Sequence, residues 1–286
     1  MSKPLSTVVA RHLAAGEPAI VVTVAAARGS TPRAAGARMV VTAGTIAGTV
    51  GGGRLEFEAM LRAREMIAAN TAEDRLELPL GPAVGQCCGG RVVLSLRRAD
   101  AESVRDLAAL EQEETQRTPQ VAVFGAGHVG TALVHALAPL PLRILWCDGR
   151  PGALAGLAWD NVATQTGDAL GVLARCEAGA AVVVLTHSHA LDYAITEAAL
   201  RRGDLAYVGL IGSQTKRRRF ERWFAARGGN AAALARLVCP IGDAGVIDKR
   251  PPVIAAFTAT ELLRLLLRES IGAGAAKQDG RWPETV

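Results

Sequence analysis

The sequence is poor in aromatic side chains and has no long uninterrupted apolar run. Phe, Trp and Tyr make up 4% of its 286 residues, and no nucleic-acid reader module is recognisable, so nucleic-acid binding is not expected. No stretch reaches the roughly 18 consecutive apolar residues of a membrane-spanning helix, so no membrane association is expected. Arg11 and His12 interrupt the N-terminal segment, which lacks the features of a secretory signal and favours a cytoplasmic protein.

Cysteine is also scarce. The five cysteines, Cys87, Cys88, Cys147, Cys176 and Cys239, are odd in number and scattered, which favours reduced thiols over a disulfide framework. No CxxC pair indicates structural zinc. The net charge of +5 suits an anionic ligand and is equally explained by surface arginine, so charge alone decides nothing.

The apolar pattern divides the chain into two domains. Residues 18–98 mix apolar strand runs, Gly/Pro turns and one helical stretch. Residues 99–119 turn polar and acidic, which indicates a helical or loose linker and a domain boundary near Thr118. Beyond them, buried strand runs such as QVAVFG, RILWCD and AAVVVLTH alternate with helical segments, which requires a parallel sheet with helical crossovers. We therefore predict an α/β protein in which a C-terminal Rossmann-like doubly wound parallel sheet follows a smaller N-terminal α+β domain. The predicted segments are an α+β domain at 1–100, a linker at 101–118, the Rossmann-like domain at 119–271 and a flexible tail at 272–286.

The strongest motif is a glycine-rich turn between a strand and a helix. It reads GAGHVG, with Gly125, Gly127, His128 and Gly130 as candidate phosphate-binding residues. Glycines at these positions allow a tight turn, close approach of a phosphate and close packing of helix on strand. Asp148 ends the next strand, where a carboxylate could accept a hydrogen bond from a ribose. The turn indicates a nucleotide-like site, or a fold that kept the turn without a ligand.

A second glycine-rich turn lies in the N-terminal domain. Arg33 and Arg38 precede Gly51, Gly52 and Gly53, which lead into a helix. Consecutive amides can form a nest for anionic oxygens, with arginine as an additional donor. The alternative is a hairpin in which Glu56 supplies the negative charge at the helix start.

A pair of thiols lies between glycines in GQCCGG. Buried cysteine is usually structural. The flanking glycines, however, would let a ligand approach, so Cys88 and Gly89 are candidate cofactor-binding residues. Cys88 is also the candidate metal ligand, because thiolates bind soft metals and pass sulfur.

Two further segments end predicted strands of the parallel sheet. His187 and His189, in THSHALD, are expected to line the crevice at the carboxyl ends of the strands. An independent metal site is disfavoured there because the other three histidines do not supply further ligands. Ser213 is a candidate helix N-cap, and Lys216 a candidate phosphate contact or part of a solvated helix face.

Taken in order, the motifs GSTPRxxGARM, GGG, GQCCGG, VxVFGAGHVG, WCDGRP, THSHxxD and YVGLIGSxxKRxRF resemble those of the xanthine dehydrogenase accessory proteins, the XdhC/CoxI family. The resemblance runs from about Arg28 to Leu266. Near the C-terminus the family tends toward GxKTPxEIAxSIxAE, whereas this chain has GVIDKRPPVIAAFTATE.

The resemblance implies a cytosolic, usually dimeric chaperone without catalytic residues. Such a protein binds the molybdenum cofactor, protects it while a cysteine desulfurase adds sulfur, and delivers it to the molybdenum subunit of apo-xanthine dehydrogenase. Two alternatives stay open: an NAD(P)-dependent oxidoreductase, indicated by GAGHVG with Asp148, and a scaffold that only contacts the dehydrogenase.

Overall fold

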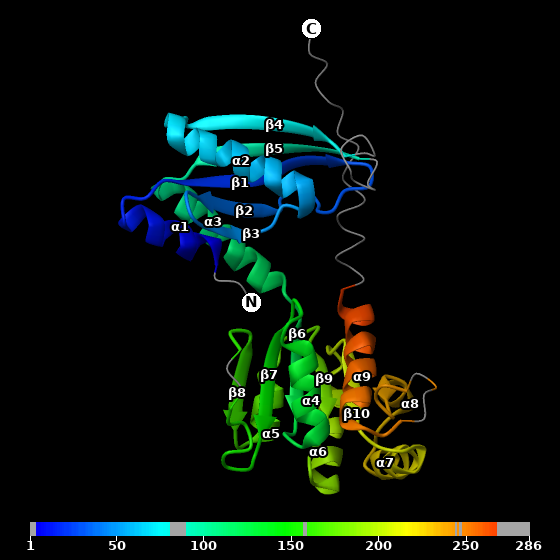
Figure 1. Ribbon diagram of the computed structural model, residues 1–286. Coiled ribbons are helices and arrows are strands. Elements are labelled where there is room, and N and C mark those ends of the chain that lie inside the picture. The colour runs from blue at the N-terminus through cyan, green and yellow to red at the C-terminus, as the bar shows by residue number, and fades with distance from the viewer. Residues whose placement is uncertain (1–3, 81–89, 157–158, 244, 246–247, 268–286) are drawn as a thin grey trace. The chain divides into compact units, whose positions relative to one another are not determined.

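The computed structural model describes residues 4–80, 90–156, 159–243, 245 and 248–267. The chain divides into two compact units, Ser2–Arg117 and Thr118–Val286, and each is described by itself (Figure 1). Among the described residues, no helix is long and apolar enough to cross a membrane.

The N-terminal unit is an antiparallel sheet with helices on both faces. Its strand order is β3-β2-β1-β5-β4. The elements are α1 (Leu5–Ala14), β1 (Ala19–Arg28), β2 (Arg38–Thr42), β3 (Ile46–Gly48), α2 (Gly53–Ala69), β4 (Glu73–Pro79), β5 (Arg91–Arg98) and α3 (Ala101–Arg117). Helix α2 buries Leu55, Ala59 and Met66 against one face of the sheet. Helices α1 and α3 cover the other face.

Helix α3 occupies the segment that the sequence suggested was a linker. Its buried Leu107 packs with Val8 and Val9 of α1, so residues up to Arg117 belong to the N-terminal unit. The rest of the helix is mostly exposed, which explains its polar composition. A narrow apolar stripe is enough to attach an otherwise polar helix to the apolar face of a sheet.

The C-terminal unit is a doubly wound parallel sheet, as predicted. Its strand order is β11-β10-β9-β6-β7-β8, and all of its pairings are parallel. The elements are β6 (Gln120–Phe124), α4 (His128–Leu137), β7 (Arg143–Asp148), β8 (Val162–Thr166), α5 (Ala169–Ala174), β9 (Ala181–Val184), α6 (His189–Arg202), β10 (Tyr207–Leu210), α7 (Gln214–Ala226), α8 (Ala231–Leu234), β11 (Leu237–Val238) and α9 (Pro251–Leu266). The chain order reverses between β6 and β9, the point at which open α/β sheets bind ligands.

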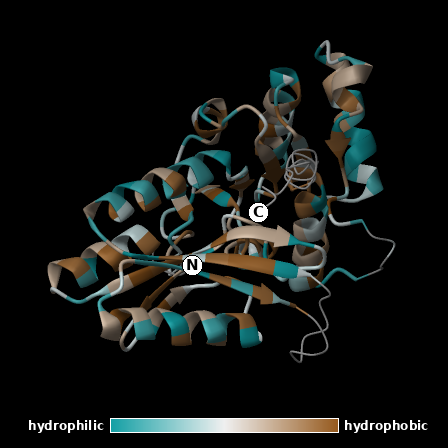
Figure 2. Ribbon diagram, turned by 90° about the horizontal axis from the view of Figure 1, so that it is seen from above, coloured by the Kyte–Doolittle hydropathy of each residue, from teal (hydrophilic) through white to brown (hydrophobic). Residues whose placement is uncertain are grey.

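Two hydrophobic clusters sandwich this sheet. Helices α5, α6 and α7 cover one face, and α4 and α9 cover the other. The strands β9 and β10 are buried at every position, because a parallel sheet covered on both faces needs apolar side chains on both. In Figure 2 the strands of the N-terminal sheet are likewise largely brown, whereas the helices carry both brown and teal residues.

Candidate functional site

In the glycine-rich turn after β6, the backbone at two glycines lies close to neighbouring backbone atoms. Gly125 has a φ of 124°, and a Cβ there would overlap the Leu185 carbonyl; its N–H donates to the Cys147 carbonyl at 2.7 Å. A Cβ on Gly130 would overlap the Gly125 carbonyl. Gly127, the N-cap of α4, has a φ of −81° and nothing within 4 Å of an added Cβ. Two of the three glycines are therefore required by packing, and the middle one faces open space.

The Asp148 carboxylate ties the end of β7 to this turn. It accepts from the Ala126 N–H at 2.6 Å, and from the Arg150 N–H at 2.9 Å and guanidinium at 2.8 and 2.9 Å. Its side chain is 2% exposed. The hydrogen bonds from the Arg150 side chain, followed by those from the backbone amides of Arg150 and Ala126, outweigh the effect of burial and lower the Asp148 pKa to about 2.

These contacts change the expected role of Asp148. The sequence predicts a carboxylate open to a ribose hydroxyl, but in the structure a carboxylate's roughly four acceptor positions are taken by Ala126 and Arg150. Arg150 is a participant that the motif search missed. Its place in WCDGRP, two residues after the carboxylate, could have indicated the pair.

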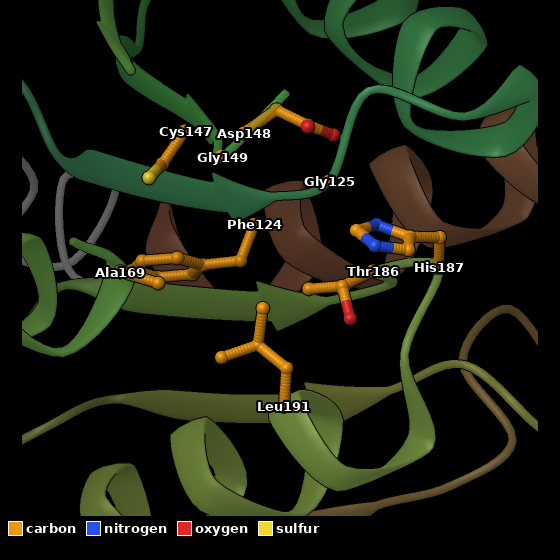
Figure 3. A pocket seen from close by; sticks show the side chains of 9 residues that line it. All are labelled: Phe124, Gly125, Cys147, Asp148, Gly149, Ala169, Thr186, His187 and Leu191. Carbon is orange, nitrogen blue, oxygen red and sulfur yellow. The ribbon is translucent and has the colours of Figure 1, made fainter. Parts of the chain in front are cut away.

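A small cavity lies at the carboxyl ends of β6, β7 and β9. Phe124, Cys147, Thr186 and His187 surround it, and Leu191 of α6 lies opposite (Figure 3). Its volume of about 10 Å³ suffices for about one water molecule. Burial raises the pKa of the Cys147 thiol to about 11, so it stays protonated at neutral pH. This pocket is too small for a cofactor ring.

The two histidines of THSHALD occupy different places. His187 lines the small cavity, whereas His189 is the first residue of α6, after the N-cap Ser188. Among the described residues, no group of three or more His, Cys, Asp or Glu side chains could hold a metal ion.

Lys216 forms a buried ion pair with Asp192, the last residue of THSHALD. Its ammonium lies 2.5 Å from Asp192 Oδ2, and the two side chains are 13% and 1% exposed. Asp192 Oδ1 accepts from the Thr186 amide at 2.9 Å and from its hydroxyl at 2.7 Å. The sequence placed Lys216 on a phosphate or in solvent; in the structure it joins α7 to Asp192 in the first turn of α6. Ser213 caps α7 as expected, accepting from the Lys216 N–H at 3.3 Å.

A much larger cavity of about 690 Å³ opens beside the glycine-rich turn. Its walls are Ala126, Gly127, His128, Thr131, Ala132 and His135 from the turn and α4, Arg150, and Pro251 and Pro252 at the start of α9. Helices α4 and α9 pack side by side (Figure 1). The first N–H groups of a helix lack intrahelical partners and carry partial positive charge. With the Arg150 guanidinium, these walls suit an anionic group, and the volume admits a fused heterocycle.

In the N-terminal glycine turn, a side chain of the following helix α2 accepts hydrogen bonds from the turn. Gly51, Gly52 and Gly53 have φ of 140°, 74° and 58°. Glu56 accepts a hydrogen bond from the Thr49 hydroxyl and another from the Val50 N–H at 3.1 Å. Burial raises the pKa of Glu56, but these bonds, with those from the Gly52 and Gly51 amides, lower it below its ordinary value. The carboxylate thus takes the place that an external anion would have in the nest.

The contacts described for the side chains of the two candidate arginines do not include that nest, although the Arg38 carbonyl accepts from the Thr49 N–H at 3.2 Å. Arg33 is in an exposed loop, where its carbonyl accepts from the Thr31 hydroxyl at 3.1 Å. Arg38 lies on β2, 3.7 Å from Glu114 of α3. It lines a cavity of about 140 Å³ with Ser95 and Asp106. Cys88 and Gly89 lie outside the described residues, so the structure leaves their roles as predictions.

Comparison with known proteins identifies the family. The family model for the XdhC Rossmann domain matches residues 121–262, and that for the XdhC and CoxI family matches residues 12–78. The uncharacterized protein YqeB of Escherichia coli (strain K12) is 26% identical over 251 residues, which are 83% of this chain. The chain spans 42% of the length of that curated relative.

A solved structure shares the fold of this chain. It is the crystal structure of a xanthine dehydrogenase from Bacillus halodurans, at 18% sequence identity. The match covers 94% of this chain and 96% of that one with a TM-score of 0.74, and at this identity it shows the fold. The two family matches and the ordered motifs establish that this chain belongs to the XdhC and CoxI family.

Proposed function

We propose that this protein binds the molybdenum cofactor, protects it during sulfuration and delivers it to apo-xanthine dehydrogenase. Membership in the XdhC and CoxI family supports a role in xanthine dehydrogenase maturation. The protein would act in the cytoplasm as a homodimeric carrier rather than as a catalyst. A cysteine desulfurase and the molybdenum subunit of the dehydrogenase would be its partners.

The observation that carries the proposal is the 690 Å³ cavity at the start of α4. When bound, the cofactor would bring a terminal phosphate, a pterin ring and molybdenum held by a dithiolene. The first N–H groups of α4 and the Arg150 guanidinium would receive the phosphate. Thr131 and the apolar edges of Ala132 and Pro251 would flank the ring. The adjacent 10 Å³ pocket would admit no part of the ring.

The internal ion pair makes Arg150 a prepared anion contact. Its Nε and Nη2 already donate to Asp148, which fixes the plane of the guanidinium and leaves the Nη1 group for a ligand. A guanidinium held in place loses little conformational entropy when an anion binds. The same Asp148 contacts weigh against the oxidoreductase alternative, because the ribose acceptor is engaged.

The decisive experiment is direct analysis of bound cofactor. We expect the full chain purified from molybdenum-replete cells to carry pterin, measured by fluorescence after oxidation, and molybdenum, measured by mass spectrometry, in similar amounts. Absence of both, together with no saturable binding of released cofactor, would refute the proposal. Binding of NADPH with turnover of a hydride acceptor would instead support the oxidoreductase.

A matched cysteine pair tests whether a thiol holds the metal. We expect Cys88→Ala to lower molybdenum retention more than Cys239→Ala does. Cys239 is 2% exposed, and burial raises its pKa to about 11, so it remains an unreactive thiol. Equal retention by the two variants would remove Cys88 from the proposed metal site.

A further inference from the structure

A second large cavity is lined by the middle and end of α9, whereas only the start of α9 lines the cavity beside the glycine-rich turn. Its volume is about 500 Å³. It is bounded by β10, β11, the loop after β11 and the middle and end of α9. It shares no lining residue with the 690 Å³ cavity, and three of its lining residues, Phe257, Thr260 and Glu261, lie in the segment GVIDKRPPVIAAFTATE.

One wall of this cavity is a carboxylate held by a buried tyrosine. The Tyr207 hydroxyl donates to Glu261 Oε2 at 2.9 Å, and Tyr207 is 5% exposed. A Cβ on Gly209 would lie 2.5 Å from the Tyr207 ring and 2.9 Å from its hydroxyl oxygen. Glycine at 209 therefore makes room for the ring, and the ring places its hydroxyl on Glu261.

A second donor fixes the same carboxylate oxygen. The Gly242 N–H donates to Glu261 Oε2 at 3.3 Å. Gly242 has a φ of 65°, and a Cβ there would lie 2.8 Å from the Thr258 hydroxyl and 2.9 Å from the Ile254 carbonyl. The loop can press this closely against α9 only with glycine at that position. Among the described residues, Glu261 Oε1 has no hydrogen-bond partner, so it keeps both lone pairs for a ligand.

The remaining walls add an aromatic face, two arginines, Arg236 and Arg264, and the acidic residue Asp243. Phe257, Glu261 and Arg264 follow one another at i, i+4 and i+7 along α9 and all line the cavity, as residues on one helix face do. Phe257 is partly exposed, and Leu265, 40% exposed, continues the apolar surface. An aromatic ring, a fixed acceptor and a guanidinium in one cavity match a flat heterocycle that has N–H donors at one edge and an anionic substituent.

We infer that this cavity binds a 2-amino-4-oxopyrimidine ring, the ring edge shared by pterins and guanine, with Glu261 as its acceptor. The adjacent N–H groups of that edge converge on the free carboxylate oxygen, the ring lies against Phe257, and an anionic substituent reaches Arg264. The proposal is independent of cofactor delivery. It stands if the purified protein carries no molybdenum, and fails separately if isolated heterocycles do not bind.

Calorimetric titration of the full chain tests the inference. The probes are pterin-6-carboxylate, GMP and AMP, because adenine lacks the paired N–H edge. We expect pterin-6-carboxylate, GMP or both to bind at least tenfold more tightly than AMP, since a site that accepts from paired N–H groups rejects an analogue that lacks them. Binding of the pterin alone identifies a pterin as the ligand, and binding of GMP alone identifies a guanine nucleotide.

Two carboxamide variants locate the acceptor. Glu261→Gln keeps an oxygen for the Tyr207 hydroxyl but replaces part of the acceptor edge with a donor, so we expect affinity to fall about tenfold or more. Glu221→Gln is the matched control, because Glu221 pairs with Arg217 on α7, within the same unit, and should bind as the unsubstituted chain. Equal binding of AMP, no saturable heat with any probe, or an unchanged affinity in a folded Glu261→Gln protein would overturn the inference. If Glu261→Gln does not fold, the selectivity of the unsubstituted chain for GMP or the pterin over AMP decides.

Discussion

The two glycine-rich turns of this protein lead into helices in the same way but close differently. In each, a carboxylate of the same unit accepts a hydrogen bond from a turn amide: Glu56 from Val50, and Asp148 from Ala126. Glu56 comes from the first turn of the helix that follows. Asp148 comes from the neighbouring strand and brings Arg150 with it. The first turn is therefore neutralised by a lone carboxylate, whereas the second keeps a guanidinium beside its amides.

The glycines of the two turns are also needed for different reasons. At Gly51, Gly52 and Gly53 the backbone has positive φ throughout. In the second turn only Gly125 has positive φ, and Gly130 is required by contact with the Gly125 carbonyl. Gly127 meets neither condition. The fold therefore does not require glycine at position 127, which lines the 690 Å³ cavity. Close approach of a ligand would explain why this residue is glycine.

The largest expected loss of stability distinguishes a glycine that is required by packing from one that is required by its backbone conformation. We expect Gly130→Ala to lower the free energy of unfolding by about 3 kcal/mol, because its methyl group would overlap backbone that cannot move without shifting β6. Gly52→Ala, with open space around it but φ of 74° and ψ of −179°, a backbone region essentially confined to glycine, should cost less, about 1–2 kcal/mol of backbone strain. Urea denaturation of both variants measures the difference. Equal losses would show that the two turns depend on glycine for the same reason.

The next largest effect is a pH-dependent loss of stability, which should be larger for Asp148 than for Glu56. The folded-state pKa of Asp148 is about 2, below the ordinary 3.8. Ionised Asp148 therefore contributes stability above about pH 4, and this is lost as the pH falls toward 2. We expect Asp148→Asn to cost about 2 kcal/mol at pH 7, and the gap to the unsubstituted chain to shrink between pH 4 and pH 2.

Glu56→Gln supplies the comparison for that experiment. The Glu56 pKa is also lowered, but burial opposes its hydrogen bonds and no arginine pairs with it in the contacts described. The loss at neutral pH should have the same sign and be smaller than for Asp148→Asn. Denaturation midpoints at pH 7, 4 and about 2.5 measure both. A gap for Asp148→Asn that stays constant over this range would mean that the carboxylate is not stabilised as an anion.

The fold could be predicted because its signals are local. Strands such as Ala181–Val184 are apolar at every position, and GAGHVG marks a strand-to-helix turn by itself. Helix α3 was harder, since only a narrow stripe around Leu107 is buried and the polar remainder resembles a linker. The sequence thus indicates where elements lie more reliably than which unit a half-exposed helix joins.

The side-chain partners in the site were less accessible from sequence. Lys216 and Asp192 lie 24 residues apart, on helices that follow adjacent parallel strands. The strand order alone places both residues at one edge of the sheet. Whether they pair with each other or face a ligand depends on side-chain geometry, which the strand order does not give. For Tyr207 and Glu261 the separation is 54 residues. That contact depends on how α9 packs on β10, which no local pattern encodes.

The substitution with the smallest expected effect on stability, Gly127→Ala, should nevertheless weaken cofactor binding. Gly127→Ala places a methyl group into open space at ordinary φ, so we expect a loss of less than about 1 kcal/mol, as for a weaker N-cap. The same methyl group would stand where a phosphate must approach the first N–H groups of α4, so cofactor retention should fall about fivefold or more. Gly44→Ala is the matched control, because Gly44 also has open space and no positive φ and lies in the N-terminal unit. Pterin and molybdenum content of the two purified variants, beside their urea midpoints, measures both effects. If Gly127→Ala retains cofactor as well as Gly44→Ala does, the turn is an element of the fold alone, and the proposed cofactor site beside it must be abandoned.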